Sequence, residues 1–377
     1  MNTILKRSAI IFLGMSHTVK LLPAFLLVIV NFCTAQKIDF DFNFDNAKET
    51  IAILKEKNTS EAQLQAFTKL PGTQAVIKKI KANDLLAADA IKNAANGVFP
   101  KNSRNFQYEM IAGNLTEWEN FINLVISKQD SIKDVLRKSF SPFLDKTKSY
   151  QFNIYFLMGS YSMGFTFGGS DAFYVGLHRY KFDLQAVILT CKHELFHNIQ
   201  NMYYDAEKTA ERLGKIGKGY ENTQSLLNYL FKEGAATYIE EYKLLKNKNT
   251  SFLRELKGQS AVNDYRINSL NLLVNTILLN AFNHPESAGF NDCYELLFDW
   301  NWNNPAYYVG EKMTEALTEV KGKEILLDYL KKDAVYFFID YIELAKTNKE
   351  KYPIRFSAEF TEMANKIKTQ IELVNNK

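Results

Sequence analysis

The chain has 377 residues, with 46 lysines and arginines against 42 aspartates and glutamates, which gives a formal net charge of +4. Lys6, Arg7 and Lys20 supply +3 of this charge and no acidic residue precedes position 36, so the rest of the chain carries +1. This near-neutral remainder argues against a nucleic-acid-binding protein.

The N-terminus has the pattern of a secretory signal peptide. A run of about twelve mostly apolar residues, 21–32, follows Lys20 and precedes Cys33-Thr34-Ala35, a cleavage site of small residues. A membrane span needs roughly twenty apolar residues. We therefore expect residues 1–35 to be removed and the protein to be exported, to the periplasm or out of the cell, without stable membrane insertion. Met15 is an alternative start to Met1, and the residues before Cys33 do not fit a lipoprotein signal.

The remaining 342 residues, 36–377, suffice for one large domain or two lobes. Residues 36–145 are predicted to form a helical region, broken at 70–72 and 96–100, with a long amphipathic stretch at 116–144. Residues 146–377 are predicted to form the catalytic domain with C-terminal helices, broken at Pro285 and Pro305. We see no internal repeat.

At the start of this second region the hydrophobic period changes from 3.6 to 2. Residues 151–158 and 172–177 are predicted to be strands. The glycine-rich segment between them is either a plain hairpin loop or the wall of a binding cleft. The expected fold is α+β but mainly α, with a small mixed sheet packed on one helix and additional helices around it.

That helix carries His193-Glu194-Leu195-Phe196-His197. Positions four apart on a helix lie one above the other, so two imidazoles can bind one zinc ion, and Glu194 lies beside it to take a proton from a bound water. Asp183 fits the N-cap. One apolar stripe faces a core, formed by Leu184, Ile188, Cys191, Leu195, Ile199 and Met202. Cys191 is therefore expected to be a buried thiol. The alternative is an ordinary amphipathic helix with two solvated histidines.

A catalytic zinc usually has three protein ligands and a water. The candidate third ligand is Glu233, 36 positions after His197, with Glu240 close to it on the same edge of a second predicted helix. A carboxylate beside an apolar stripe is costly to bury without a partner such as zinc. On local pattern alone, Glu233 is otherwise a solvated helix-face charge.

These motifs resemble those of a known superfamily. His-Glu-x-x-His at 193–197, followed by Glu-Gly-x-Ala-x-Tyr at 233–238, is similar to the gluzincin metallopeptidases. The nearest likeness is to uncharacterised zinc-dependent peptidases exported by Bacteroidetes-type bacteria. The resemblance implies a zincin-like core, with zinc held by His193, His197 and Glu233 and with Glu194 as general base. The chain departs from the aminopeptidase-like members in its longer connection through 212–219 and in lacking their exopeptidase motif.

The resemblance implies further roles. In gluzincins a strand just before the active helix forms the edge that binds substrate backbone. This would place Gly169, Ser170, Ala172 and Tyr174 along the cleft. The segment 304–313 resembles a Tyr-x-x-Gly stretch of these peptidases, so Tyr307, or alternatively Tyr308, would donate a hydrogen bond to the developing oxyanion.

Glu240 is expected to orient a ligand histidine. Together these features predict a zinc-dependent peptidase that acts on peptide or protein substrates. Two alternatives remain open: a catalytically silent zinc-fold protein that binds peptide or glycan at the cell surface, and a helical exported protein whose histidine pair is incidental. The sequence leaves the substrate, the choice between endo- and exo-cleavage, and the oligomeric state open.

Overall fold

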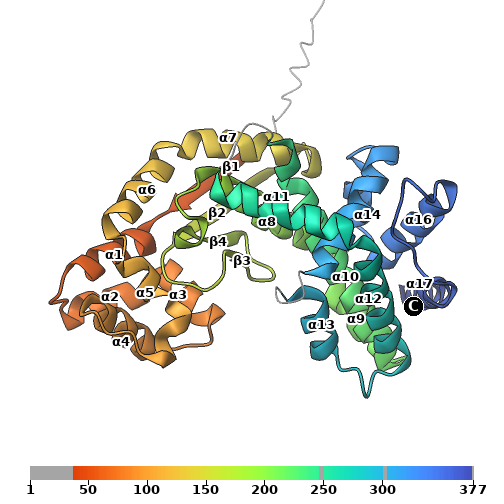
Figure 1. Ribbon diagram of the computed structural model, residues 1–377, viewed down its shortest axis with the longest axis horizontal. Coiled ribbons are helices and arrows are strands. Elements are labelled where there is room, and N and C mark those ends of the chain that lie inside the picture. The colour runs from red at the N-terminus through yellow and green to blue at the C-terminus, as the bar shows by residue number, and fades with distance from the viewer. Residues whose placement is uncertain (1–36, 246–249, 300–303, 376–377) are drawn as a thin grey trace, which may run out of the picture. The chain divides into compact units, whose positions relative to one another are not determined.

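The computed structural model describes residues 37–245, 250–299 and 304–375, which belong to one compact unit (Figure 1). The predicted signal peptide, residues 1–35, lies outside the described residues. Among those that are described, no helix combines the length and the apolar character of a membrane span.

Four strands form one mixed sheet in the order β1-β2-β4-β3. Strand β2 (Ser149–Leu157) pairs in parallel with both β1 (Lys37–Asn43) and β4 (Ala172–Gly176). Strand β3 (Gly164–Thr166) pairs antiparallel with β4 and forms one edge of the sheet, and β1 forms the other. Strands β2 and β4 confirm the two strands predicted from the period-2 pattern.

Strand β1 falls in the region predicted to be helical, so that prediction is wrong for its first residues. Its sequence, KIDFDFN, alternates apolar and polar side chains, which is the pattern of a half-buried strand. Phe40 pairs with Phe152 of β2, and their ring centroids lie 5.8 Å apart. Because the partner strand lies more than 100 residues later, local helical patterns around 45–145 concealed it.

The N-terminal helices agree with the predicted breaks: α2 ends at Lys69 and α3 begins at Pro71, in the first helical turn where proline is tolerated. The stretch 116–144 is not one helix, because Lys128 leaves the helical conformation between α6 and α7. The helices of this region are α1 (Asp45–Lys55), α2 (Glu61–Lys69), α3 (Pro71–Lys79), α4 (Asp84–Ala95), α5 (Tyr108–Ala112), α6 (Leu115–Ser127) and α7 (Gln129–Phe140), with short 3-10 helices η1 (Lys101–Phe106) and η2 (Ser141–Phe143).

The remaining helices are organised around α8 and α10. Helix α8 packs on β3 and β4, and α10 packs on α8, α9, α12, α14 and α16. They are α8 (Leu184–Tyr203), α9 (Ala206–Gly214), α10 (Lys218–Glu240), α11 (Ser251–Tyr265), α12 (Ile267–Asn283), α13 (Phe290–Phe298), α14 (Pro305–Lys321), α15 (Ile325–Leu330), α16 (Ala334–Thr347) and α17 (Ala358–Asn375), with 3-10 helices η3 (Leu177–Tyr180) and η4 (Tyr242–Leu244). The fold is thus mainly helical with a small mixed sheet, as predicted.

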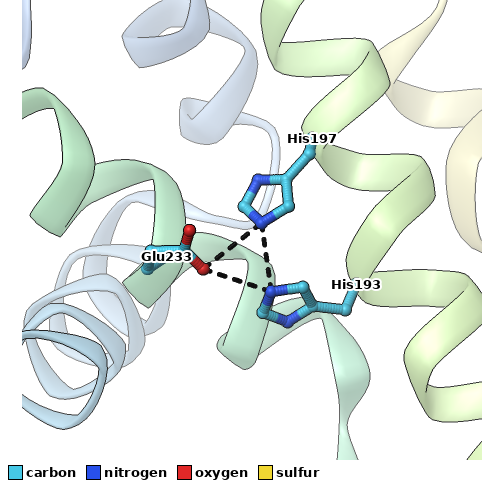
Figure 2. Close-up of side chains that lie close together, drawn as sticks. All are labelled: His193, His197 and Glu233. Atoms are coloured by element: carbon cyan, nitrogen blue, oxygen red, sulfur yellow. Dashed lines mark hydrogen bonds and ion pairs between the residues drawn. The ribbon is translucent and has the colours of Figure 1, made fainter. Parts of the chain in front are cut away.

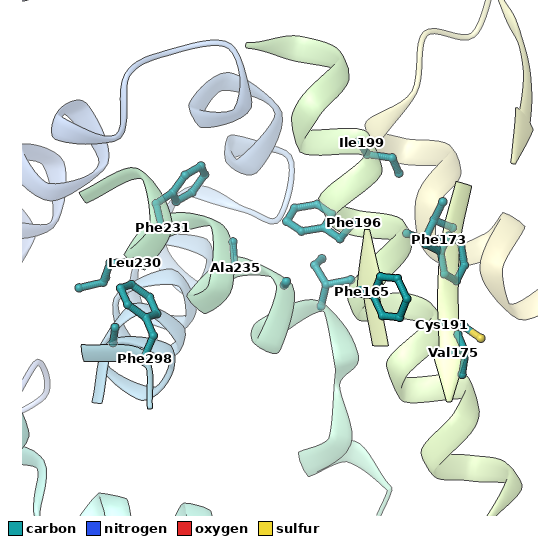
Figure 3. Packing of buried hydrophobic residues seen from close by; sticks show 14 of the residues in the cluster. Phe165, Phe173, Val175, Cys191, Phe196, Ile199, Leu230, Phe231, Ala235 and Phe298 are labelled. Atoms are coloured by element: carbon teal, nitrogen blue, oxygen red, sulfur yellow. The ribbon is translucent and has the colours of Figure 1, made fainter. Parts of the chain in front are cut away.

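The buried core joins the sheet, α8 and α10. Asp183 caps α8 by accepting hydrogen bonds from the backbone N–H groups of Gln185 and Ala186. Figure 3 shows side chains of the strands beside those of the two helices, with Phe173 and Val175 near Cys191 and with Phe231 and Ala235 on α10. Cys191 is a buried free thiol, as predicted. Met202, at the end of the predicted apolar stripe, is instead exposed.

Candidate metal centre and active site

His193 and His197 of α8 converge on Glu233 of α10 (Figure 2). The Nε2 atoms of the two histidines lie 3.0 Å apart, and Glu233 Oε2 lies 3.2 Å from His193 Nε2 and 3.3 Å from His197 Nε2. Ligand atoms bound tetrahedrally to zinc at ~2.0–2.1 Å are separated from one another by roughly 3.3 Å. The three atoms therefore form a triangle of the size that one zinc ion requires.

Each imidazole is held by a hydrogen bond on its far nitrogen. His193 Nδ1 lies 2.7 Å from Glu240 Oε1, and His197 Nδ1 lies 2.8 Å from Gln200 Oε1. Because both oxygens accept, each Nδ1 donates, and the Nε2 of each imidazole, once it has lost its proton, offers a lone pair to a metal ion. Three acceptors that face one point in a largely buried site need a cation between them.

Glu240 thus lies where the sequence placed it, against a candidate ligand. Gln200 was missed as a functional residue. It is buried, and its Nε2 donates to the carbonyl oxygen of Lys232 at 3.0 Å, the residue before Glu233. One amide side chain therefore orients His197 and also links α8 to α10. Its position three residues after His197, on the same side of the helix, is the signal that was available.

A second contact joins the same helices beyond Glu233. The buried Lys192 Nζ donates to the Glu240 carbonyl oxygen at 3.0 Å and lies 2.6 Å from Glu241 Oε2. Glu241 does not continue α10, because its φ of 58° ends the helix there. The lysine holds the end of α10 close to His193.

Charges in the metal-free site are strongly coupled. Burial lowers the pKa of His193, but the carboxylates of Glu233 and Glu240 outweigh burial and hold that pKa well above its usual value. Burial raises the pKa of Glu233, but the two imidazoles outweigh it and lower that pKa far below its usual value. A bound metal ion takes the place of the proton shared among these groups.

Glu194 is buried and lies against strand β3. A Cβ atom added to Gly164 would lie 2.6 Å from Glu194 Oε1 and 2.7 Å from Thr190 Cγ2, so only glycine leaves room for the carboxylate. Burial raises the pKa of the Glu194 carboxyl, while the charges of His193, His197 and Lys79 oppose the rise. A carboxyl with a raised pKa is suited to take up a proton and return it.

The strand predicted to form the substrate-binding edge lies inside the sheet. Strand β4, which contains Ala172 and Tyr174, has β2 on one side and β3 on the other, so its main-chain groups are used within the sheet. Tyr174 stacks on Tyr155 and Phe165, and Gly169 and Ser170 lie in the turn between β3 and β4. The edge strand next to β4 is β3, which has three residues and is too short to produce a recognisable alternation.

The outward groups of β3 follow from its pairing. Gly176 N donates to Met163 O at 2.8 Å, and antiparallel strands alternate between residues that bond to the partner and residues that do not. Phe165 therefore bonds to Tyr174, whereas the main-chain N–H and C=O groups of Gly164 and Thr166 point away from the sheet. Gly164, the residue of β3 that contacts Glu194, is thus one of the two residues whose main-chain groups point away from the sheet.

The structure separates the two candidate tyrosines. The Tyr307 ring stacks on His193, with 6.4 Å between ring centroids, and its hydroxyl donates to Glu233. Burial and then the Glu233 charge hold the pKa of Tyr307 well above its usual value, so the hydroxyl keeps its proton. Tyr308 turns away and bonds to Asp264.

Among the described residues, two further histidines, His178 and His284, lie outside the triad. His178 is buried and its Nε2 lies 2.7 Å from Ser160 O, while His284 is exposed just after α12. Within the part of the chain that the structure describes, His193, His197 and Glu233 are the one group of three such side chains close enough to share a metal.

A family model described as "Putative zinc dependent peptidase (DUF5700)" matches residues 64–350, more than half of the chain. The chain belongs to this family. Searches of curated proteins and of solved structures find no match. Zinc is the metal named for the family. The triad supplies the nitrogen and oxygen donors that zinc prefers, and the distances between these donors fit one zinc ion.

Proposed function

We propose that the protein is an exported zinc-dependent peptidase of the gluzincin type, in which His193, His197 and Glu233 bind zinc and Glu194 is the general base. The observation that carries the proposal is the triangle of His193 Nε2, His197 Nε2 and Glu233 Oε2, with sides of 3.0, 3.2 and 3.3 Å. The family description supports the reaction class.

The zinc ion, Glu194 and Tyr307 have separate roles in the proposed hydrolysis. Zinc, when bound, polarises the scissile carbonyl and lowers the pKa of a water toward ~7. Glu194, buried next to His193, removes a proton from the attacking water and returns it to the leaving amine. Tyr307, whose hydroxyl stays protonated, donates a hydrogen bond to the oxyanion that develops on the substrate.

Strand β3 positions the substrate backbone. An extended peptide that adds to this edge hydrogen-bonds to the outward main-chain groups of Gly164 and Thr166, without requiring particular side chains. Because Gly164 contacts Glu194, a peptide held there presents its scissile bond beside the general base. Export is supported by the sequence pattern of residues 1–35.

The test is to compare wild type with Glu194→Gln and with the control Glu286→Gln, which changes an exposed glutamate after α12. All three proteins should carry about one zinc per chain, because Glu194 is not among the proposed ligands. In a digest of a peptide library, Glu194→Gln should lose at least ~10²-fold in turnover because an amide cannot accept the proton.

Three outcomes would contradict the proposal. Equal cleavage by wild type and Glu194→Gln, with contaminating protease excluded, would remove Glu194 from the mechanism. A zinc-loaded wild type that cleaves nothing in the library would favour the silent zinc-binding protein instead. Absence of zinc from protein prepared without chelator would refute the metal site itself.

A further inference from the structure

Two lysines at the end of helix α3 lie against the edge strand. Lys79 Nζ lies 5.3 Å from the centroid of the Phe165 ring, and Lys78 Nζ lies 4.1 Å from the centroid of the Phe167 ring. Both rings belong to β3 and to the residue just after it. A segment more than 80 residues before the edge strand thus supplies two positive charges beside the candidate site.

These charges have no carboxylate partner. Within the described part of the chain, no aspartate or glutamate oxygen lies within 4.0 Å of either Nζ, although other lysines, such as Lys37 and Lys368, do form such pairs. Lys79 is half-buried. Its charge nevertheless reaches Glu194, where it opposes the rise in pKa that burial causes.

The pairing of β3 decides which substrate side chains meet the lysines. Side chains on one strand alternate between the two faces, and residues directly opposite each other on neighbouring strands point to the same face. Gly164 turns toward α8 and Glu194. The side chains of Phe165 and Phe167 turn the other way, toward α3. A peptide residue opposite Phe165 or Phe167 therefore points at Lys79 or Lys78.

We propose that Lys79 and Lys78 bind a carboxylate of the substrate on the α3 side of strand β3, and so make the enzyme selective for acidic peptides. This inference rests on the proposed peptidase function. The carboxylate is either the side chain of an aspartate or glutamate near the scissile bond or the free C-terminus of a short peptide. Both present the same anionic group to the two ammonium groups.

The test uses N-acetylated alanine-rich octapeptides in which one glutamate, or one glutamine, is moved through every position. Each peptide is made as the free acid and as the C-terminal amide. Binding is measured by calorimetry to zinc-loaded Glu194→Gln protein, which does not depend on turnover, and kcat/KM is measured with the active protein. The variants are Lys78→Met with Lys79→Met, which removes both charges, and Lys79→Glu, which reverses one.

The matched control is Lys133→Met. Lys133 Nζ lies 4.9 Å from the Phe42 ring on β1, at the opposite edge of the sheet, so this change removes the same kind of contact away from the site. The control should keep the wild-type preference. Circular dichroism of every variant checks that the fold is retained.

We expect wild type to prefer the glutamate peptide over its glutamine partner at one or two positions, by roughly five- to tenfold in affinity and in kcat/KM. The double methionine variant should lose the preference while binding the glutamine peptides like wild type, and Lys79→Glu should favour the glutamine peptide over its glutamate partner. If the free acid binds better than the amide and the glutamate position is irrelevant, the carboxylate is the C-terminus.

Equal binding of all members by wild type, or an unchanged preference in the double variant, would overturn the inference. Failure of the peptidase proposal is distinguishable, because peptides with a carboxylate would then bind in the lysine-dependent manner while wild type cleaves none of them. Absence of binding by every peptide would count against the inference as well.

Discussion

Gly234 and Gly310 bring helices α10 and α14 into direct backbone contact. A Cβ atom added to Gly234 would lie 2.3 Å from the carbonyl carbon of Gly310, and one added to Gly310 would lie 2.5 Å from Leu230 O. Glu233 precedes the first glycine, and Tyr307 lies one turn before the second. The glycine contact therefore places Tyr307 on the triad.

Gly310→Ala should disturb both stability and site. Because the obstructing atoms are backbone, the helices must separate, at a cost of roughly 1–3 kcal/mol in the free energy of unfolding. Urea denaturation measures the loss. The control is Gly258→Ala in α11, whose added Cβ meets nothing within 4 Å and should leave stability equal or slightly higher. Equal stability of Gly310→Ala and wild type would contradict the close crossing.

Gly164→Ala should separate metal binding from turnover. The added methyl group displaces Glu194 without touching the three candidate ligands, so the zinc content should stay at about one per chain. We expect kcat/KM to fall by at least ~10-fold, because a positioned general base contributes roughly 10²- to 10⁴-fold to the rate. Gly168→Ala, in the same segment but with nothing within 4 Å, is the control. Wild-type turnover in Gly164→Ala would show that Glu194 is not confined by β3.

Gln200→Ala should weaken zinc binding by roughly 10- to 100-fold, the usual effect of removing a group that orients a ligand histidine. Competition with a chromogenic chelator measures the affinity. Asn201→Ala is a suitable control, because it removes another hydrogen bond between α8 and α10, the one from Lys232 Nζ at 2.9 Å, without touching His197. Similar losses in both variants would mean that Gln200 acts only through helix packing.

His178 should make the fold sensitive to acid. Burial lowers its pKa to about 3, whereas in the unfolded chain it titrates near its ordinary value of 6.5. Below pH 6.5 the unfolded chain binds a proton at this histidine and the folded protein does not. The free energy of unfolding therefore decreases as the pH is lowered, by up to ~1.4 kcal/mol per pH unit.

His178→Gln, which keeps a donor for Ser160 O, should flatten the pH dependence of unfolding between pH 6 and pH 4, as followed by urea titration at each pH. His284→Gln changes an exposed histidine and should leave the slope unaltered. A wild-type slope in His178→Gln would show that His178 is not the group responsible.

The sequence analysis singled out the three residues of the triad, but it did not identify the strand and the helix that lie beside them. His193 and His197 are one helical turn apart, so local geometry alone aims both rings at one point. Glu233 was predicted as the third ligand with the help of the resemblance of residues 233–238 to a Glu-Gly-x-Ala-x-Tyr motif. Strand β3 was not recognised, because three residues do not show a period. Lys79 was missed because its position depends on how α3 packs, which no local pattern encodes.

Long-range strand pairing also explains why the sequence analysis predicted residues 36–145 to be a helical region and did not recognise strand β1. Strand β1 takes its place only when residues 149–157 are present, since it pairs with β2 from Lys37–Ser149 to Asn43–Tyr155. A fragment that stops at 145 would lack β2, so β1 would have no strand partner and Phe40 and Phe42 would lose their contacts with Phe152 and Phe156. Such a fragment is an aggregation hazard rather than an independent domain. For expression of truncated chains, the first safe cut lies after the sheet is closed, not at the end of the helices.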